Sequence, residues 1–228
     1  MHALAEARRK PYLGIQMEGP IASWYTRNAR HRLHDYWTTA QAIAAQLPAG
    51  SRVLEVAPGP GFFAIELAKL GRYHITGLDI SRSFVRIASD NARQAGVAID
   101  FEQGDVARMP FADGSFDLIV SQAAFKNFPD PVASLNEMHR VLRPGGRASI
   151  FDLRKDAPLE TIDRAIREMH LSPINAWLTK FIFRFGLLRA AYTRTALEAV
   201  VARSRFGRGE LLQDGIGFEL RLVKQVDV

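Results

Sequence analysis

The fold is decided by the stretch VLEVAPGPGFFAIELAKLG, residues 53–71. Its first part, Val53–Val56, is mostly apolar and β-branched, as in a buried strand, whereas the apolar residues from Phe63 to Leu70 recur at helical spacing. Between them, Gly59 and Gly61 allow a sharp turn and leave no Cβ in the way of a ligand. The stretch therefore predicts a strand, a tight loop and a helix, with a ligand over the loop.

A carboxylate follows this loop at an informative distance. Residues 73–79 are typical of a second strand that ends in Asp79, 18 residues after Gly61. That spacing is close to the ~20 residues expected of an acid that accepts hydrogen bonds from a ribose diol. A helix N-cap is the other interpretation of Asp79, because Ile80 and Ser81 lead into a helical pattern.

After residue 79, helical and strand patterns follow one another along the chain, and the last two patterns are both strands. We predict helices over 81–95, 131–142 and 192–203, and strands over 97–103, 115–121, 147–153, 206–212 and 216–223. The last two strands are joined by residues 213–215, which include an Asp-Gly pair suited to a tight turn. They are therefore expected to form a β-hairpin.

Several short motifs occur in order along the chain. They are Glu55 with Gly59 and Gly61, then Asp79, Gly104-Asp105, FDLIVS at 116–121 and VLRPGG at 141–146. As a set covering about residues 50–153, they resemble the class I S-adenosylmethionine-dependent methyltransferases, most closely the type 11 family that includes ubiquinone and menaquinone methyltransferases. A weaker similarity runs from Tyr192 to the end. Ala57 departs from the family, which usually has glycine at that position.

The resemblance implies a fold and a cofactor. The fold is α/β, a Rossmann-like, doubly wound and mostly parallel seven-stranded sheet with an antiparallel C-terminal hairpin. The cofactor is S-adenosyl-L-methionine, converted to S-adenosyl-L-homocysteine, with no metal. The residues that the resemblance assigns to the cofactor are Tyr25, Glu55, Ala57, Gly59, Gly61, Asp79, Ile80, Gly104, Asp105, Val106 and Ser121.

Two of these assignments have alternatives. In the family, an acid at the place of Asp105 accepts a hydrogen bond from the adenine amino group, with Val106 beside the ring; a simple turn aspartate is the other interpretation. Tyr25 lies where relatives often have a tyrosine near the cofactor, so it is either a lid residue or a packed aromatic side chain.

Methyl transfer makes few demands on catalytic side chains. In-line displacement at an activated sulfonium needs mainly alignment of donor and acceptor and exclusion of water. If the acceptor must lose a proton, the candidates are Lys126, His170 and Asp152. Relatives commonly have histidine at the places of Lys126 and Asn127, so Lys126 is a departure; it could pair with an anionic substrate instead.

The segment 155–190 is the least family-like and is the expected source of acceptor specificity. Within 171–190, an apolar stripe is flanked by basic residues and contains no acid; the stripe comprises Trp177, Phe181, Phe185 and Leu188. An ordinary packed helix, a lid over an apolar pocket and a helix on a membrane surface all fit this pattern. We expect the acceptor to be a small, apolar or aromatic molecule.

Length and composition indicate one α/β domain with additions. We divide the 228 residues into an N-terminal helical extension or lid, 1–49, and a cofactor-binding domain, 50–228. In the extension, a rough helical spacing is kept by Ile21, Trp24, Tyr25 and Asn28 and then by Leu33, Trp37 and Ala40, and Ile43 and Leu47 continue the apolar side. These residues are expected to pack against the sheet. The absence of cysteine excludes disulfides and thiolate chemistry. No run of about 18 apolar residues and no secretory signal is apparent, which favours a cytoplasmic protein.

The charge is basic and unevenly placed. Lys and Arg exceed Asp and Glu by 3 in residues 1–50 and by 4 in 153–228, whereas 51–152 carries a net −1, which together gives +6. Basic flanks attract phosphates, anionic lipid or acidic substrates, but a solvated arginine-rich surface has the same composition. Nucleic acid is an unlikely partner because the chain lacks known reader motifs. The oligomeric state is left open.

Two other functions share part of this pattern. An NAD-dependent oxidoreductase would have the glycine loop and Asp79, but Glu55, Asp105 and the terminal hairpin count against it. A non-catalytic subunit that binds S-adenosylmethionine would keep every acidic anchor. The sequence alone does not separate such a subunit from an enzyme.

Overall fold

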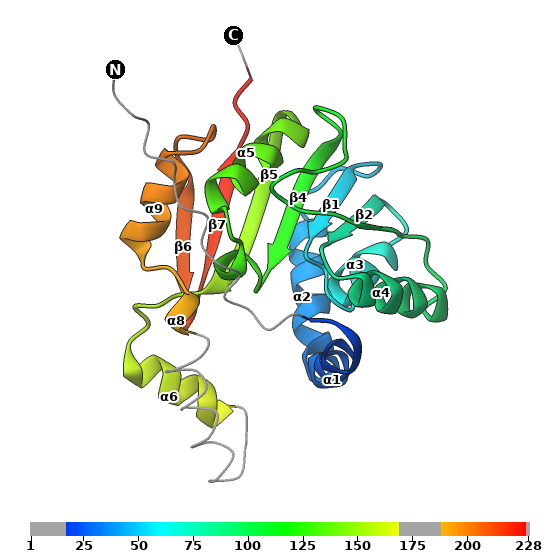
Figure 1. The fold of residues 1–228 in the computed structure, drawn as a ribbon, viewed down its shortest axis with the longest axis horizontal. Coiled ribbons are helices and arrows are strands. Elements are labelled where there is room, and N and C mark those ends of the chain that lie inside the picture. Colours follow the sequence, from blue (N-terminus) through cyan, green and yellow to red (C-terminus); the bar gives the residue numbers. More distant parts are fainter. Residues whose placement is uncertain (1–16, 169–187, 227–228) are drawn as a thin grey trace.

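The computed structural model describes residues 17–168 and 188–226. Within these ranges, seven strands form one sheet in the order β3-β2-β1-β4-β5-β7-β6 (Figure 1). The strands are β1 (Arg52–Val56), β2 (His74–Asp79), β3 (Asp100–Gln103), β4 (Phe116–Gln122), β5 (Leu142–Leu153), β6 (Glu210–Asp214) and β7 (Gly217–Val223). The predicted Rossmann-like sheet is confirmed.

Strand pairing places the site at one edge of the sheet. β1 lies between β2 and β4 and is parallel to both, with Glu55 opposite Gly77 and Val56 opposite Ser121. The strand order reverses beside β1, so the loops that follow β1 and β4 leave the sheet in different directions. In open α/β sheets, ligands bind outside the carboxyl ends of the strands at such a point.

The antiparallel hairpin is also confirmed, with one adjustment. β7 pairs antiparallel with both β5 and β6, and the last pair of the hairpin is Asp214 with Gly217. The two turn residues are therefore Gly215 and Ile216, whereas residues 213–215 were predicted. Gly215 has a φ of 53°, which glycine adopts without a steric penalty.

Helices cover both faces of the sheet. They are α1 (Gly19–Ala29), η1 (Arg30–Arg32), α2 (Leu33–Ala44), α3 (Phe62–Ala68), α4 (Arg82–Gln94), η2 (Phe125–Asn127), α5 (Pro131–Val141), α6 (Leu159–Glu168), α8 (Leu188–Ala190) and α9 (Arg194–Ala202). Three of them start at side-chain caps: Ser81, Asp130 and Thr193 accept hydrogen bonds from backbone N–H groups three residues later.

Two apolar clusters lie on opposite faces of the sheet. The alternation of side chains along β1 sends Leu54 and Val56 to the cluster under α5 and α9, and Val53 to the cluster under α2 and α3. Each central strand is therefore buried on both sides, which explains its nearly continuous apolar sequence.

The N-terminal helices pack differently from the prediction. Ala22, Thr26 and Ala29 form the buried side of α1, whereas Ile21, Trp24, Leu33 and Trp37 are exposed. The expectation of packing against the sheet is wrong for these four residues, whereas Ala40 and Leu47 are buried in the cluster under α2 and α3 as expected. Small side chains allow α1 to lie close to its neighbours, and its bulky apolar residues point outward.

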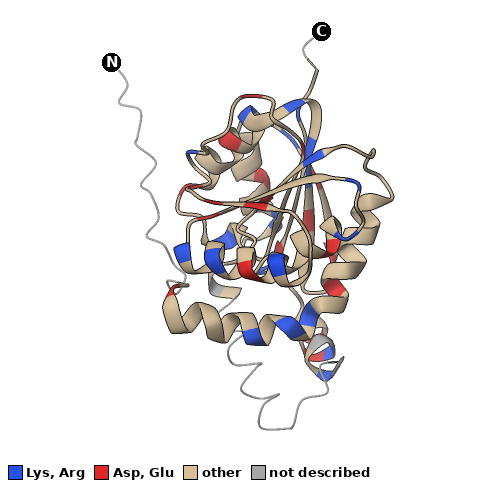
Figure 2. Cartoon of the chain, turned by 90° about the vertical axis from the view of Figure 1, so that its right-hand side faces the viewer, with Lys and Arg blue, Asp and Glu red and all other residues tan. Residues whose placement is uncertain are grey.

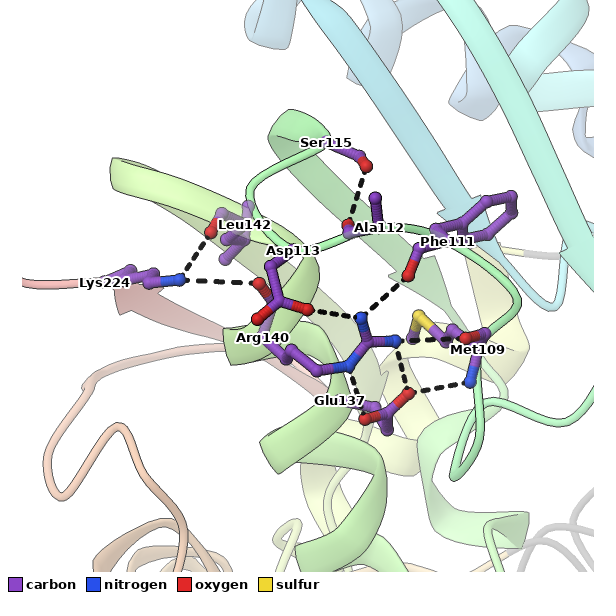
Figure 3. Close-up of polar contacts among 9 residues, drawn as sticks. All are labelled: Met109, Phe111, Ala112, Asp113, Ser115, Glu137, Arg140, Leu142 and Lys224. Atoms are coloured by element: carbon purple, nitrogen blue, oxygen red, sulfur yellow. Dashed lines mark hydrogen bonds and ion pairs between the residues drawn. The ribbon is translucent and has the colours of Figure 1, made fainter.

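An arginine on α5 fastens the long loop between β3 and β4 (Figure 3). The Arg140 guanidinium donates to the Asp113 carboxylate at 2.8 Å and to the carbonyl oxygens of Phe111 and Met109 at 2.7 and 3.0 Å. The Glu137 carboxylate accepts a hydrogen bond from the same guanidinium at 2.8 Å and another from the Met109 N–H at 2.8 Å. The pKa of Glu137 is lowered, chiefly by its hydrogen bonds with Arg140. Loop residues 104–115 are thereby held without a helix of their own.

No helix in the described ranges is long and apolar enough to cross a bilayer. Of the predicted apolar stripe, Trp177, Phe181 and Phe185 lie outside the described residues, as does His170. Leu188 is buried in a small cluster with Ile162 and Ile166 of α6.

Candidate functional site

The loop after β1 is strongly bent and open at its centre. Ala57, Gly59 and Gly61 have positive φ angles of 56°, 55° and 76°. A Cβ built on Gly59 would meet only the Tyr25 ring, at 3.9 Å. The loop is therefore uncrowded beside Gly59, and a ligand there stays a prediction.

Gly61 has a different role from Gly59. A Cβ at Gly61 would lie 2.9 Å from Phe101 Cζ and 3.0 Å from Ala88 Cβ. Gly61 is therefore needed for the close packing of α3 against α4 and β3, in addition to its left-handed backbone.

Asp79 ends β2 beside this loop. Its carboxylate accepts hydrogen bonds from the Gly59 N–H at 3.0 Å and the Ser81 N–H at 2.9 Å. Burial raises the pKa of Asp79 to about 6, although these amide hydrogen bonds oppose the rise. The cap of α4 is Ser81, which accepts from the Phe84 N–H at 3.1 Å, so the N-cap interpretation of Asp79 is wrong.

Glu55 is the second buried acid of the site. Its side chain is 3% exposed, and its carboxylate accepts from the Ala64 N–H at 3.1 Å, which joins β1 to the first turn of α3. The pKa of Glu55 is raised to about 8, chiefly by burial; the nearby Asp79 charge adds to the rise and the Ala64 hydrogen bond opposes it. Two adjacent acids with raised pKa values are typical of a functional cleft.

Aromatic side chains from the N-terminal helices lie beside the loop. Tyr25 is half-buried, and its ring packs edge-on against Phe84 with centroids 5.7 Å apart. Tyr36 packs against Phe62, with centroids 6.2 Å apart. Burial raises the pKa of Tyr25, and it raises that of Tyr36 to about 12, so both phenols stay neutral at physiological pH. Tyr25 is thus both a packed aromatic residue and a neighbour of Gly59.

The residues after β3 lie at the carboxyl edge of the sheet, as the loop after β1 does. The Gly104 N–H donates to the Asp79 carbonyl at 2.9 Å, which ties this turn to β2. Asp105 is exposed, and its carboxylate accepts from the Ala107 N–H at 2.9 Å. Asp105 also borders a small cavity of about 240 Å³. Val106 is buried in the core below it.

The end of β4 contains polar atoms without partners. Among the residues that the structure describes, Ser121 Oγ and Gln122 Nε2 are buried and make no hydrogen bond. Leaving such groups unpaired costs about 1–3 kcal/mol each, so a ligand that pairs them is favoured. Ser121 is a predicted site residue. Gln122 was missed, although a glutamine that ends an otherwise apolar strand is the signal that could have indicated it.

Lys126 and Asp152 form a buried ion pair. Their charged atoms lie 2.8 Å apart, and their side chains are 6% and 0% exposed. Asp152 also accepts from the Lys126 N–H at 2.8 Å and from the Leu153 N–H at 2.7 Å, while Lys126 Nζ donates to the Ala123 carbonyl at 2.5 Å. Two of the predicted catalytic candidates thus hold each other and fix the loop after β4.

The structure brings most predicted site residues to one edge. Glu55, Gly59, Asp79 and Gly104 are joined by direct hydrogen bonds or lie on adjacent strands. Ile80 follows Asp79 and is 61% exposed. In the described part of the chain, His, Asp and Glu form no group of three able to hold a metal. Independence of metal remains a prediction.

Comparisons with known proteins agree with this geometry. A model of the family described as "Methyltransferase domain" matches residues 54–150. Residues 54–150 are thus similar to this family of methyltransferase domains. The match covers β1, the glycine loop, Asp79, Asp105, Ser121 and most of β5, which are the elements that build the edge described above.

Relatives in sequence are quinone methyltransferases. The chain is 36% identical over 121 residues to the ubiquinone/menaquinone biosynthesis C-methyltransferase UbiE of Bdellovibrio bacteriovorus, covering 53% of this chain and 52% of that protein. It is 39% identical over 117 residues to demethylmenaquinone methyltransferase of Deinococcus radiodurans, covering 51% and 48%. The chain thus spans about half the length of these relatives.

Solved structures share the fold of this chain over most of its length. A Methanococcus maripaludis protein assigned to the S-adenosyl-L-methionine-dependent methyltransferases superposes with a TM-score of 0.74 at 21% identity, covering 94% of this chain and 97% of that one. The [4+2]-cyclase SpnF superposes with a TM-score of 0.63 at 19% identity, covering 84% and 81%. These likenesses establish the fold, and the cyclase shows that the fold does not fix the reaction.

Proposed function

We propose that this protein is an S-adenosyl-L-methionine-dependent methyltransferase that acts on a small, apolar, aromatic acceptor. The observation that carries the proposal is the pairing of Asp79 with an accessible Gly59 backbone inside a methyltransferase domain. The unpartnered Ser121 Oγ and Gln122 Nε2 at the same edge support a ligand there. The residues present fit the cofactor that the family implies.

Each part of the edge has a chemistry suited to one part of that cofactor. Asp79 can accept hydrogen bonds from ribose hydroxyls, since a carboxylate oxygen accepts more than one. Exposed Ile80 and buried Val106 offer apolar surface for the adenine ring, and Asp105 can accept from its amino group. Burial of Glu55 and Asp79 favours a ligand that brings positive charge. When bound, the cofactor supplies a methyl group on a sulfonium sulfur.

The remaining residues position the acceptor and exclude water. The Lys126–Asp152 pair is buried and hydrogen-bonded, so its role under this proposal is to hold the loop after β4, with Lys126 as a local positive charge. The similarity to quinone methyltransferases favours a quinol-like aromatic ring. Such an acceptor carries its own activating oxygen, and the protein contributes mainly alignment.

The test begins with ligand binding by the purified full chain. Isothermal titration is expected to show binding of S-adenosylhomocysteine that is tighter than binding of NAD. Asp79→Asn should weaken it about 5- to 100-fold, because a charged hydrogen-bond acceptor is lost. Asp100→Asn is the matched control, since Asp100 is exposed at the start of β3. Tighter binding of NAD would refute the proposal.

A second candidate function is a domain that binds the same ligand without transferring methyl groups. The likeness to a cyclase of the same fold is the observation that favours it. Mass spectrometry after incubation with S-adenosylmethionine and a reduced 1,4-naphthoquinone separates the two. A product heavier by one methylene unit supports methyl transfer, whereas ligand binding with no modified product from a panel of quinols and phenols supports the second candidate.

A further inference from the structure

The exposed side of the N-terminal helices is unusually apolar. Trp24 on α1 is 59% exposed and Trp37 on α2 is 47% exposed. Ile21 lies three residues before Trp24, and Leu33 lies four residues before Trp37, so each helix presents two apolar residues on one side. We call Ile21, Trp24, Leu33 and Trp37 the N-terminal apolar surface. Exposed large apolar residues that gather in this way mark interaction sites.

Positive charge accompanies this surface. Arg27, Arg30 and Arg32 are all exposed on α1 and η1, and Asp35 is the one acid between Gly19 and Ala44, so the segment has a net charge of +2. Asp35 pairs with Arg32 at 3.2 Å in an exposed ion pair, which contributes little to stability. Figure 2 shows basic positions along the helical segment at the lower edge of the molecule. Tryptophan and arginine together are the composition of helices that lie in a bilayer interface.

Helix α1, which carries part of this surface, is held in place by hydrogen bonds to the start of α4. Glu18 accepts hydrogen bonds from the Arg82 and Ser83 N–H groups at 3.0 and 3.1 Å, and the Gly19 N–H donates to Ser83 Oγ at 2.9 Å. The Ser81 hydroxyl donates to the Met17 carbonyl at 2.6 Å. These bonds attach the start of α1 to the start of α4. The exposed tryptophans are therefore carried on an anchored helix, and their exposure is a fixed feature of the fold.

The surface also lies near the ligand edge. Figure 1 places α1 at the end of the molecule to which the β4 arrowhead points, which is the carboxyl edge of the parallel strands. Tyr25, on the inner side of the same helix, contacts the Gly59 position. A flat apolar partner that meets Trp24 and Trp37 would therefore approach the mouth of the site.

We propose that the N-terminal apolar surface, with Arg27, Arg30 and Arg32, docks the protein on an anionic lipid bilayer. The tryptophan rings enter the headgroup boundary, and the arginines attract the negative surface. Charge complementarity selects this occupant over a second copy of the chain, whose same surface carries the same positive charge and would be repelled. The inference does not depend on methyl transfer.

The test uses vesicles and the full chain. Flotation with 70:30 phosphatidylcholine:phosphatidylglycerol vesicles is expected to carry the protein at 0.1 M NaCl and to release most of it at 1 M, where surface charge is screened. Pure phosphatidylcholine vesicles should bind it much less. The triple variant R27Q/R30Q/R32Q should lower the partition coefficient by one to two orders of magnitude. Trp24→Ser with Trp37→Ser should lower it at least ten-fold.

A matched control removes the same charge elsewhere. Arg203, Arg205 and Arg208 are exposed between α9 and β6, at the opposite end of the sheet, and R203Q/R205Q/R208Q should change binding less than three-fold. Trp177→Phe leaves Trp24 and Trp37 as the only tryptophans. Their emission should shift to the blue on vesicles and be quenched by brominated lipid. Melting temperatures check that each variant folds.

Several results would overturn the proposal. The wild-type protein could fail to float with anionic vesicles, or the arginine variant could bind as well as the wild type. A control variant that loses binding equally would show that overall charge, and not this surface, attracts the membrane. A dimer in sedimentation that Trp24→Ser with Trp37→Ser dissociates would show that a second copy covers the surface.

Discussion

Replacing Glu55 by glutamine should change how the stability of the protein depends on pH. Glu55 is 3% exposed and has a pKa of about 8 in the folded protein, against an ordinary value of 4.5. Because the folded-state pKa is the higher one, folding favours the protonated acid. The resulting stabilisation is complete below pH 4.5 and is lost as the pH rises through 8.

The pKa difference sets the magnitude. At about 1.36 kcal/mol per pH unit, the interval from 4.5 to about 8 corresponds to at most about 5 kcal/mol of unfolding free energy. Glutamine keeps a carbonyl oxygen for the Ala64 N–H and never ionises. The variant should match the wild type near pH 5 and exceed its stability at pH 9 by up to this amount.

The assay is urea unfolding of both proteins at pH 5, 6, 7, 8 and 9. The difference between the two unfolding free energies reports the titration of Glu55 and its coupling to Asp79, because the surface acids titrate in both proteins. Glu102→Gln, on the exposed edge strand β3, is the control and should give a constant difference. A Glu55→Gln difference that is also constant from pH 5 to 9 would refute the reasoning, since Glu55 would then titrate alike in the folded and unfolded states.

Three further predictions concern the rest of the edge. Asp105→Ala should weaken S-adenosylhomocysteine binding about five-fold or more in isothermal titration with an unchanged melting temperature, whereas Asp100→Ala should change neither. Lys126→Met should lower the unfolding free energy in urea by about 3–5 kcal/mol because it leaves the Asp152 charge buried, and adding Asp152→Asn should restore much of the loss; equal losses in both variants would contradict this. Arg140→Ala should cost about 2–3 kcal/mol in the same assay and increase amide hydrogen exchange in residues 104–115, and unchanged exchange there would show that the loop is held by other contacts.

Asp113 is a poor control for the Asp105 variant because it takes part in a tertiary contact. From the sequence it reads as an exposed turn residue and thus as a neutral control for Asp105. In the structure it accepts a hydrogen bond from Arg140 and helps to hold the loop that carries Asp105. Asp100 is the better control because it lies at the far end of β3 from the site.

The sequence by itself determined the sheet, the glycine loop and the position of Asp79. These features depend on short-range patterns: apolar runs of strand length, glycines at fixed offsets, and an acid at the end of the next strand. Helix starts at Asp130 and Thr193 depend on an equally short-range signal, because a cap bonds to a backbone group only three residues away.

Only the tertiary structure decided how the remaining residues act. Lys126 and Asp152 are 26 residues apart, and their pairing depends on adjacent β4 and β5. The spacing of Trp24 and Trp37 fits a packed helix as well as an exposed one, and the small side chains of α1 settled which side is buried. The raised pKa of Glu55 depends on its burial in the folded protein. Desolvation of a charge is set by everything that surrounds it in space and not by its neighbours in sequence.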